Sequence, residues 1–329
     1  MSSRVSSSRR LSSSRFLARV LAGAKPSPHA PRFIPPSLAT ARTQLPTGAG
    51  YVHEAKLDGY RMQAHLQDGR VTLYSRNALH WTARLPTVAD DVAQLPARAL
   101  VLDGEVVSAA DSGRANFAQL QDDLKHKRYD RLCYYAFDLL HLDGFDVRAA
   151  PLIERKRVLQ AFLAEANGRA ARVLYTEHFE DGAALYEAVC ALGLEGVVSK
   201  RADAPYRSGR TESWLKTKCL RRERFVVVGF APESGGGIAK LRLARRDGGA
   251  LVYVGRVGTG WSRKDAVEIR QALTPLTRPA CPLLKPIRRA DTVWVQPHYE
   301  AEVAYTEVTS DGMLRLLSFK GLVSDSGRG

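Results

Sequence analysis

The order of apolar and polar residues divides the chain into two parts with different patterns. Between Tyr51 and Lys218, four short runs are rich in β-branched and aromatic residues, which predicts strands over 71–75, 99–107, 132–140 and 194–200. The stretches 154–168 and 181–193 instead repeat apolar side chains every three or four residues and end near a glycine, which predicts helices. The first part is therefore expected to be an α+β domain.

The pattern changes after the basic run Lys216–Arg224, where short apolar runs alternate with glycine-rich turns. One stretch, 263–273, has helical spacing. Five runs predict strands, and they cover 224–230, 239–246, 250–258, 291–297 and 301–309. Five strands with one helix indicate a small closed β-barrel of the oligonucleotide-binding (OB) type, with a β-sandwich as the alternative.

A third segment precedes these two. The first 53 residues contain eight Lys and Arg, no Asp or Glu, and two serine runs, a composition that cannot bury a core. A nucleic-acid-binding arm, an organellar transit peptide and a misassigned start codon would each give this composition. We expect ordered chain from Phe33, which gives a disordered tail over 1–32, a first domain over 33–220 and a second over 221–329.

Composition narrows the class of protein. The 329 residues are 45% hydrophobic and 25% charged, which is typical of globular proteins, and no apolar run reaches the length of a membrane-spanning helix. The 49 Lys and Arg exceed the 34 Asp and Glu by 15, so a polyanionic partner is expected, nucleic acid before anionic membrane. The four cysteines are 57, 29 and 62 residues apart, which predicts neither a metal knuckle nor a disulfide framework and indicates a reducing compartment.

Several polar residues could carry chemistry. Lys56, in EAKLDGYR, could act as a nucleophile if burial or a neighbouring cation such as Arg61 activated its amine, although most lysines are surface residues. Glu105 and Glu195 stand next to glycines in strand-like runs, and their hard oxygens suit Mg²⁺ or Mn²⁺. Asp138 is more typical of a structural carboxylate.

Further along the chain, Lys216 and Lys218 alternate on one face of an extended segment, where they could bind phosphate or simply be solvated. Phe137 precedes Asp138 in an apolar run; it could stack on a base or belong to the core.

The order of these motifs resembles the nucleotidyltransferase superfamily, which contains the ATP-dependent DNA ligases and the mRNA capping enzymes. The motifs are K-x-D-G, D-G-E, F-D, E-G-x-x-x-K and W-x-K-x-K, followed by the small β-barrel. The resemblance is greater to the ligase module of bacterial end-joining DNA ligases, on segments such as YVHEAKLDGYR, YYAFDLLHLDG, LEGVVSKR and YVGRVGTGWS, and it runs from Phe33 to Leu322. The GRVGTG and AEVAYTEVT segments do not fit a capping enzyme.

The resemblance implies an adenylation (nucleotidyltransferase) domain, an OB-fold domain, and chemistry that uses ATP with Mg²⁺ or Mn²⁺. Lys56 would take AMP from ATP, pass it to the 5′-phosphate at a DNA break, and the 3′-hydroxyl would then displace it. The resemblance assigns phosphate contacts to Arg61, Arg76, Lys216 and Lys218, and nucleotide contacts to Glu54, Glu105 and Phe137. It also assigns the metal to Glu105 and Glu195.

The sequence departs from that branch at two places. Val323 and Ser326 stand where the branch carries Arg and Lys that orient pyrophosphate, so we expect slow loading with AMP. Ala78 stands where the branch usually has Gly.

We therefore predict a monomeric ATP-dependent DNA ligase that seals nicks or double-strand breaks in the bacterial cytoplasm, at the nucleoid. A separate end-binding protein and a repair polymerase are the expected partners. The alternative is a ligase relative that binds nucleic acid but adenylates itself poorly or not at all; RNA capping or RNA ligation is a third possibility.

Overall fold

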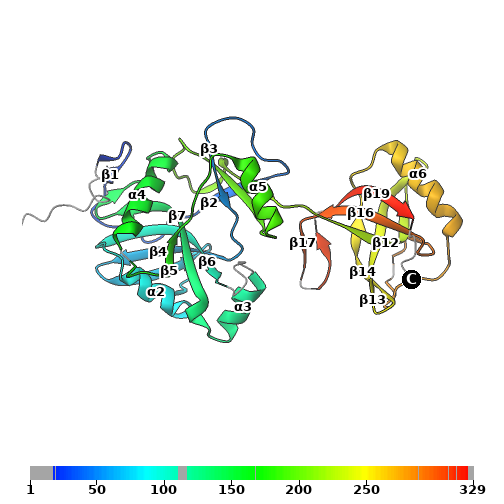
Figure 1. Ribbon diagram of the computed structural model, residues 1–329, viewed down its shortest axis with the longest axis horizontal. Coiled ribbons are helices and arrows are strands. Elements are labelled where there is room, and N and C mark those ends of the chain that lie inside the picture. The colour runs from blue at the N-terminus through cyan, green and yellow to red at the C-terminus, as the bar shows by residue number, and fades with distance from the viewer. Residues whose placement is uncertain are drawn as a thin grey trace, which may run out of the picture. The chain divides into compact units, whose positions relative to one another are not determined.

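The computed structural model describes residues 18, 20–109, 117–166, 168–287, 289–309, 311–315 and 317–324. The chain separates into two compact units, Met1–Cys219 and Leu220–Gly329, next to the boundary expected after residue 220 (Figure 1). Every helix among the described residues is too short or too polar to span a bilayer.

The first unit contains a seven-stranded sheet with the order β1-β8-β7-β6-β4-β5, in which β9 pairs with β7. All neighbours are antiparallel except β7 and β9. The strands are β1 (Lys25–Pro26), β4 (Tyr60–Gln67), β5 (Arg70–Ser75), β6 (Ala99–Ser108), β7 (Leu132–Leu142), β8 (Phe145–Asp146) and β9 (Val173–Tyr175). The predicted strands over 71–75, 99–107 and 132–140 are thus confirmed.

Helices cover one face of this sheet and bury its apolar side chains (Figure 1). This region contains the α-helices α2 (Pro86–Ala93), α3 (Phe117–Lys125) and α4 (Leu152–Glu165), and the short 3-10 helices η1 (Thr82–Arg84) and η2 (Tyr129–Arg131). The largest apolar cluster of the protein lies here, with Val158, Leu159 and Phe162 of α4 fully buried. The predicted helix over 154–168 is confirmed and begins two residues earlier.

A second, four-stranded sheet has the order β2-β11-β10-β3. Its strands are β2 (Ser37–Arg42), β3 (Tyr51–Ala55), β10 (Gly196–Arg201) and β11 (Gly209–Lys218). Helix α5 (Gly182–Ala191), which the spacing over 181–193 predicted, packs on β3 and β10. The side chain of Asp181 caps this helix by accepting a hydrogen bond from the Ala184 amide at 2.9 Å.

The second unit is a six-stranded antiparallel sheet with the order β14-β13-β12-β16-β19, in which β15 pairs with β12. The strands are β12 (Arg221–Pro232), β13 (Ile238–Asp247), β14 (Ala250–Val257), β15 (Val293–Trp294), β16 (Tyr299–Tyr305) and β19 (Ser318–Ser324). Helix α6 (Arg263–Leu273), followed by η3 (Thr274–Leu276), matches the predicted helix and begins with a capping box between Ser262 and Asp265.

The strand prediction for the second unit was wrong in two details. The run 301–309 is divided into β16 and β17 (Glu307–Val308), which pairs with β18 (Leu314–Arg315). The strand β19 was missed because its alternation is short and it contains Gly321.

The predicted start of ordered chain at Phe33 also needs correction. Leu21 is buried in the large apolar cluster, and β1 pairs with β8. The pairing of β1 with β8 joins segments more than a hundred residues apart in the sequence. The Ser/Arg-rich composition of the N-terminal segment therefore could not predict it. The rest of the predicted tail, residues 1–17 and 19, lies outside the described residues.

The prediction that the cysteines form no disulfide was wrong for one pair. Cys190, in the last turn of α5, and Cys219, just after β11, are joined by a disulfide with their Cα atoms 5.4 Å apart. Sequence spacing could not show this pair, because it forms only when α5 packs beside β10 and thus near the end of β11.

Candidate active site

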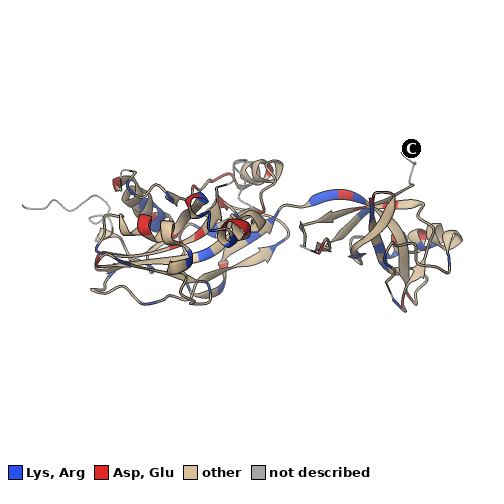
Figure 2. Cartoon of the chain, turned by 90° about the horizontal axis from the view of Figure 1, so that it is seen from below, with Lys and Arg blue, Asp and Glu red and all other residues tan. Residues whose placement is uncertain are grey.

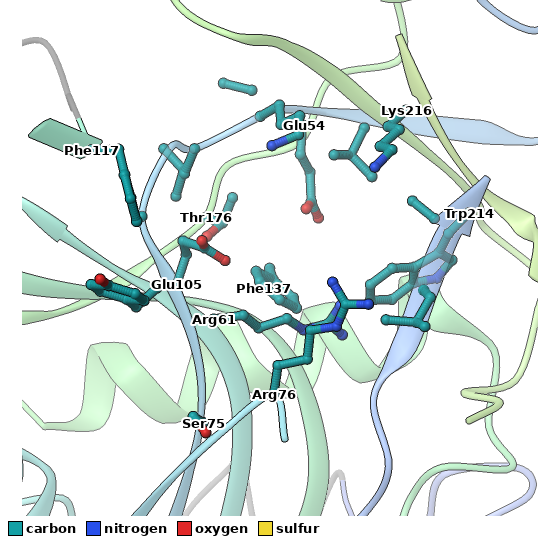
Figure 3. Close-up of a pocket in the computed structure, with 18 of the residues that line it drawn as sticks. Glu54, Arg61, Ser75, Arg76, Glu105, Phe117, Phe137, Thr176, Trp214 and Lys216 are labelled. Atoms are coloured by element: carbon teal, nitrogen blue, oxygen red, sulfur yellow. The ribbon is translucent and has the colours of Figure 1, made fainter. Parts of the chain in front are cut away.

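A cavity of about 500 Å³ lies between the two sheets of the first unit (Figure 3). Arg61, Glu105 and Phe137 reach it from the seven-stranded sheet, and Glu54 and Lys216 reach it from the four-stranded sheet (Figure 3). Its volume is in the range of cavities that bind small molecules and cofactors.

Lys56 stands where the chain passes from one sheet to the other, between β3 and β4. Its amide donates a hydrogen bond to the Gly196 carbonyl at 2.8 Å, which extends the pairing of β3 with β10 by one residue. Gly59 then lets the turn lie against β6: a Cβ atom there would be 2.1 Å from the Val106 carbonyl oxygen. The K-x-D-G motif is thus a tight connection that fixes Lys56 at the edge of the cavity.

The Lys56 ammonium forms an ion pair with Glu195, and Lys218 contacts the other carboxylate oxygen of Glu195 at 2.9 Å. All three side chains are about one-fifth exposed. Burial would raise the pKa of Glu195, but the charges and hydrogen bonds of the two lysines outweigh it and hold this pKa below its ordinary value. Glu195 therefore remains a carboxylate and holds Lys56 in place.

Lys216 lines the cavity and stands two residues before Lys218 on the same face of β11, as the alternation predicted. Its pKa is lowered, first by burial and then by the nearby charges of Lys56 and Lys218. Lys56, Lys216 and Lys218 therefore lie close to one another, and three cations placed in this way can bind the phosphates of a polyanionic ligand.

Glu105 is the carboxylate of this cavity whose negative charge is least balanced by nearby positive charges. Burial raises its pKa to about 7, although Lys56 and Arg61 act to lower it. Its side chain points into the cavity (Figure 3). The nearby cations Lys56 and Arg61 are paired with Glu195 and Asp103, so a metal ion could supply the balancing positive charge.

Arg61 reaches the cavity wall but is already bound within the protein. Its Nε and Nη2 donate to Asp103 at 3.0 and 2.7 Å, and Nη1 donates to the Ser37 carbonyl at 2.6 Å. Its guanidinium carbon also lies 5.2 Å from the ring centroid of Phe137. Of the five N–H groups of an arginine, two are left for a phosphate.

Arg76 lies in the turn after β5, and its side chain extends into the cavity (Figure 3). The turn closes through a hydrogen bond from the Ala78 amide to the Ser75 carbonyl at 2.9 Å. Ala78 has a φ of 61°, in the left-handed region that favours glycine. This explains why glycine is usual at the position, and it indicates strain in the turn that carries Arg76.

Glu54 forms two ion pairs that the sequence did not predict. Lys156 of α4 and Lys200 of β10 contact its two carboxylate oxygens, each at 2.6 Å, and all three side chains are buried. Burial lowers the pKa of Lys200 to about 8, although Glu54 acts to raise it. The Lys200 amine also lies 4.3 Å from the ring centroid of Phe137 and 4.1 Å from that of Trp214.

Most of the predicted site residues meet in this cavity. Its lining includes Glu54, Lys56, Arg61, Arg76, Glu105, Phe137 and Lys216. Glu195 and Lys218 lie beside Lys56 through their ion pairs. Asp138 is structural, since its carboxylate is fully buried in a bidentate pair with Arg155 at 2.7 and 2.8 Å.

No role in the site was expected for Lys156, Thr176, Lys200 or Trp214, although Lys200 and Trp214 belong to the E-G-x-x-x-K and W-x-K-x-K motifs. Trp214 shares the alternation of Lys216 and Lys218, and Lys200 ends a run already assigned to a strand, so these two could have been found. Lys156 and Thr176 carry no local signal, because each lies in the site through contacts with distant elements.

Comparison with known proteins identifies the family. The ATP dependent DNA ligase domain matches residues 36–218, and the ATP dependent DNA ligase C terminal region matches residues 234–326. This chain therefore belongs to the ATP-dependent DNA ligases.

Similarity is found to the end-joining branch of these enzymes. The chain is 36% identical over 311 residues to the multifunctional non-homologous end joining protein LigD of Pseudomonas aeruginosa, a match that covers 90% of this chain and 36% of that protein. It is 33% identical over 281 residues to a probable DNA ligase of Mycobacterium sp. (strain KMS), covering 79% and 52%. The chain thus spans between a third and about half of the length of these relatives.

Among solved structures, the ligase domain of LigD from M. tuberculosis is 33% identical, with a TM-score of 0.52 over 88% of this chain and 95% of that domain. A mycobacterial DNA ligase D complexed with ATP and MES is 32% identical, with a TM-score of 0.50, covering 88% of this chain and 95% of that one.

Proposed function

We propose that this protein joins breaks in DNA by way of an AMP bound to Lys56, as part of end-joining repair. The observation that carries the proposal is the position of Lys56 at a cavity between two sheets, with its ammonium against Glu195 and with Lys216 and Lys218 close by. Similarity to LigD supports the end-joining role.

Joining would proceed through three displacements at phosphorus. The Lys56 nitrogen forms a bond to the α-phosphate of ATP while the bond to pyrophosphate breaks. The 5′-phosphate at the break then takes AMP from the lysine, and the 3′-hydroxyl displaces AMP to form the phosphodiester. A lysine that pairs with Glu195 as an ammonium has no lone pair, so loading requires that the pair open and a proton leave. The cations Lys216 and Lys218 would stabilise charge on the phosphate.

The nucleotide would lie deeper in the cavity. Phe137 lines this part of the cavity and would contact the base beside Arg61 and Lys200, which lie over its ring. Glu54 would accept a hydrogen bond from the exocyclic amine of adenine, and its two lysine partners hold its carboxylate in position. Guanine carries an oxygen at the same place, which a carboxylate would repel, so this arrangement favours ATP over GTP.

Glu105 is the residue that best fits a divalent metal, because its partly buried carboxylate faces the cavity and the nearby cations Lys56 and Arg61 are paired with other acids. The described residues contain no cluster of three or more His, Cys, Asp or Glu that could hold a metal by themselves. The remaining ligands would be phosphate oxygens and water, as is usual for Mg²⁺, and Mn²⁺ would fit the same set. Glu195 would join them only after Lys56 leaves it. The metal would supply Lewis-acid stabilisation of phosphate charge.

The second unit would be an OB-type barrel that contacts DNA. Barrel closure is supported by a hydrogen bond from the Phe319 amide in β19 to the Thr259 carbonyl just after β14, at 2.9 Å, since these strands lie at opposite edges of the sheet. Its strand β12 begins with the exposed cations Arg221, Arg222 and Arg224, which suit a phosphate backbone (Figure 2). Nicked or broken double-stranded DNA at the nucleoid, in the cytoplasm, would be the substrate. An end-binding protein and a repair polymerase would be the partners.

The test is intact-mass measurement of the full chain after incubation with ATP and Mg²⁺ or Mn²⁺. The expected result is a gain in mass of one AMP, which disappears when 5′-phosphorylated nicked DNA is added and sealed product forms. A chain that gains no AMP with either metal, yet binds nicked DNA, would support the alternative of a ligase relative that does not adenylate itself.

A further inference from the structure

A second cavity, of about 380 Å³, shares Tyr60 and Trp81 with the active-site cavity. We call it the aromatic groove. Its other lining residues come from η1, α3 and η2 or lie next to them, and they are Ala83, Arg84, Gln121, Leu124, Lys125 and Tyr129. None of the proposed steps of DNA joining uses this groove.

The lining of the groove includes three aromatic side chains, Tyr60, Trp81 and Tyr129. The ring centroids of Tyr60 and Trp81 are 4.8 Å apart, and all three side chains are only partly buried. Each packs with one side against the main apolar cluster and leaves part of its surface accessible. Exposed aromatic surface of this kind is what a nucleic-acid base stacks on, without regard to its sequence.

The charges of the groove have one sign. Arg84 and Lys125 are exposed at its rim, and none of the described residues that line it is acidic. The guanidinium carbon of Arg84 lies 5.0 Å from the ring centroid of Trp81, so this cation lies over the aromatic surface. A base can stack on a guanidinium plane as well as on a ring, and both cations can contact the phosphates on either side of it.

The position of the groove indicates whether it binds a base within a duplex or an unpaired base. Because Tyr60 and Trp81 line both cavities, an occupant of the groove lies next to the place where Lys56 would act on the break. Bases inside a duplex are stacked on each other and present only their edges. An unpaired base has its faces free and can enter such a groove at little cost.

We infer that the aromatic groove binds an unpaired nucleotide of a DNA strand at the break, in an overhang or a short flap beside the point of joining. The inference rests on the proposed function, because it takes the active-site cavity to be the place where DNA is joined. It gives the protein a preference for breaks whose ends are not fully paired, which are the breaks that end joining meets.

Binding by the full chain tests this inference without any need for catalysis. Two nicked duplexes differ only in that one carries a single unpaired 2-aminopurine nucleotide at the nick, and affinity for each is measured at one salt concentration. We expect tighter binding of the duplex with the unpaired nucleotide, by about 5- to 150-fold, because stacking of one base contributes about 1 to 3 kcal/mol. Quenching of 2-aminopurine fluorescence should accompany it.

Two variants remove the groove in different ways. Tyr129→Leu removes a ring while keeping apolar contact with the core, and Arg84→Ala combined with Lys125→Ala removes the two cations. Each should lose most of the preference and sealing of a fully paired nick should stay as in wild type. The matched control, Arg70→Ala with Arg207→Ala, removes two exposed cations of the same unit that line neither cavity, and should keep the preference.

Equal affinity of wild type for both duplexes would overturn the inference, as would a preference that survives in both groove variants or is lost equally in the control. A wild type that shows the preference but seals no DNA would refute the proposed function instead.

Discussion

The ammonium of Lys56 lies against the carboxylate of Glu195, 139 residues further along the chain, and Lys218 contacts the same carboxylate from β11. Three separate motifs thus meet through one acidic side chain. Before any nucleotide binds, the ion pair with Glu195 holds the side chain of the proposed nucleophile in a fixed position. Opening of the pair would then be the event that prepares Lys56 for attack.

Replacement of the nucleophile should stop loading. Lys56→Ala should gain no AMP with ATP and should not join DNA with ATP, because no other amine occupies its position. Joining of a nick that already carries AMP on its 5′-phosphate should continue, since that step needs no lysine nucleophile. Lys285→Ala, an exposed lysine of the second unit, is the control and should behave as wild type. An AMP adduct on Lys56→Ala, detected by intact mass, would contradict the assignment.

The pKa of Glu105 predicts a pH dependence of stability. Burial raises this pKa to about 7, whereas in the unfolded chain the group titrates near its ordinary value of 4.5. Between these values the folded protein binds the extra proton, so this group's contribution to stability is lost as pH rises toward and through 7. Glu105→Gln does not titrate and should therefore gain stability over wild type as pH rises from 5 to 8, on the order of 3 kcal/mol at most.

Urea unfolding of both proteins across that pH range measures the difference. Curves of unfolding free energy that run parallel from pH 5 to pH 8 would show that Glu105 is not destabilised by burial. Addition of Mg²⁺ with a nucleotide should stabilise wild type more than the Gln variant at pH 8 if Glu105 holds the metal.

The disulfide between Cys190 and Cys219 should stabilise the region around Glu195. It closes a loop of 29 residues that contains Glu195, and the Cys219 amide donates to the Glu195 carbonyl at 3.0 Å. Cys190→Ser should lower the free energy of unfolding by roughly 3 to 4 kcal/mol under oxidising conditions, by the loop-entropy relation. With dithiothreitol present, wild type and variant should unfold alike.

Peptide mapping under non-reducing conditions detects the pair directly. Cys133→Ser is the control, because Cys133 is a free cysteine, and it should leave the mapped disulfide unchanged. A wild-type protein whose stability is the same with and without dithiothreitol would show that the pair is not formed in solution.

Strain at Ala78 should be relieved by glycine. Its φ of 61° costs an alanine about 1 to 2 kcal/mol, and glycine loses part of that gain through its greater freedom in the unfolded chain. Ala78→Gly should therefore raise the free energy of unfolding by about 0.5 to 1 kcal/mol. Ala188→Gly, at an exposed position inside α5, should lower it by a similar amount. Thermal unfolding of wild type and the two variants measures these differences. A loss of stability in Ala78→Gly would show that the backbone at Ala78 is not strained.

The absence of basic side chains at positions 323 and 326 should slow the transfer of AMP from ATP to Lys56. Val323 pairs with Glu300 in the register of β19 and β16, whereas Ser326 lies outside the described residues. Neither side chain can neutralise departing pyrophosphate. Val323→Arg with Ser326→Lys should speed AMP loading and leave the joining of a pre-adenylated nick unchanged. Rapid loading by wild type, with no gain in the double variant, would show that another cation has this role.

The sequence by itself determined the parts of this protein that are local. Strands such as β6, β7 and β10 follow from runs of β-branched and aromatic residues, and α4, α5 and α6 follow from helical spacing. The motif order was enough to indicate the family and to name Lys56, because these motifs are short, contiguous and placed at turns and strand ends.

Tertiary structure alone decided which charges are buried and what they contact. In α4, the run ERKR would ordinarily be solvated, yet Arg155 and Lys156 are fully buried against Asp138 and Glu54. Cys190 finds Cys219 in the same way. A buried charge is tolerable only when an opposite charge meets it, and that partner comes from an element distant in sequence. Local patterns report whether a side chain is charged, but only the packing of helices and sheets against each other decides whether that charge is solvated, paired or left to bind a ligand.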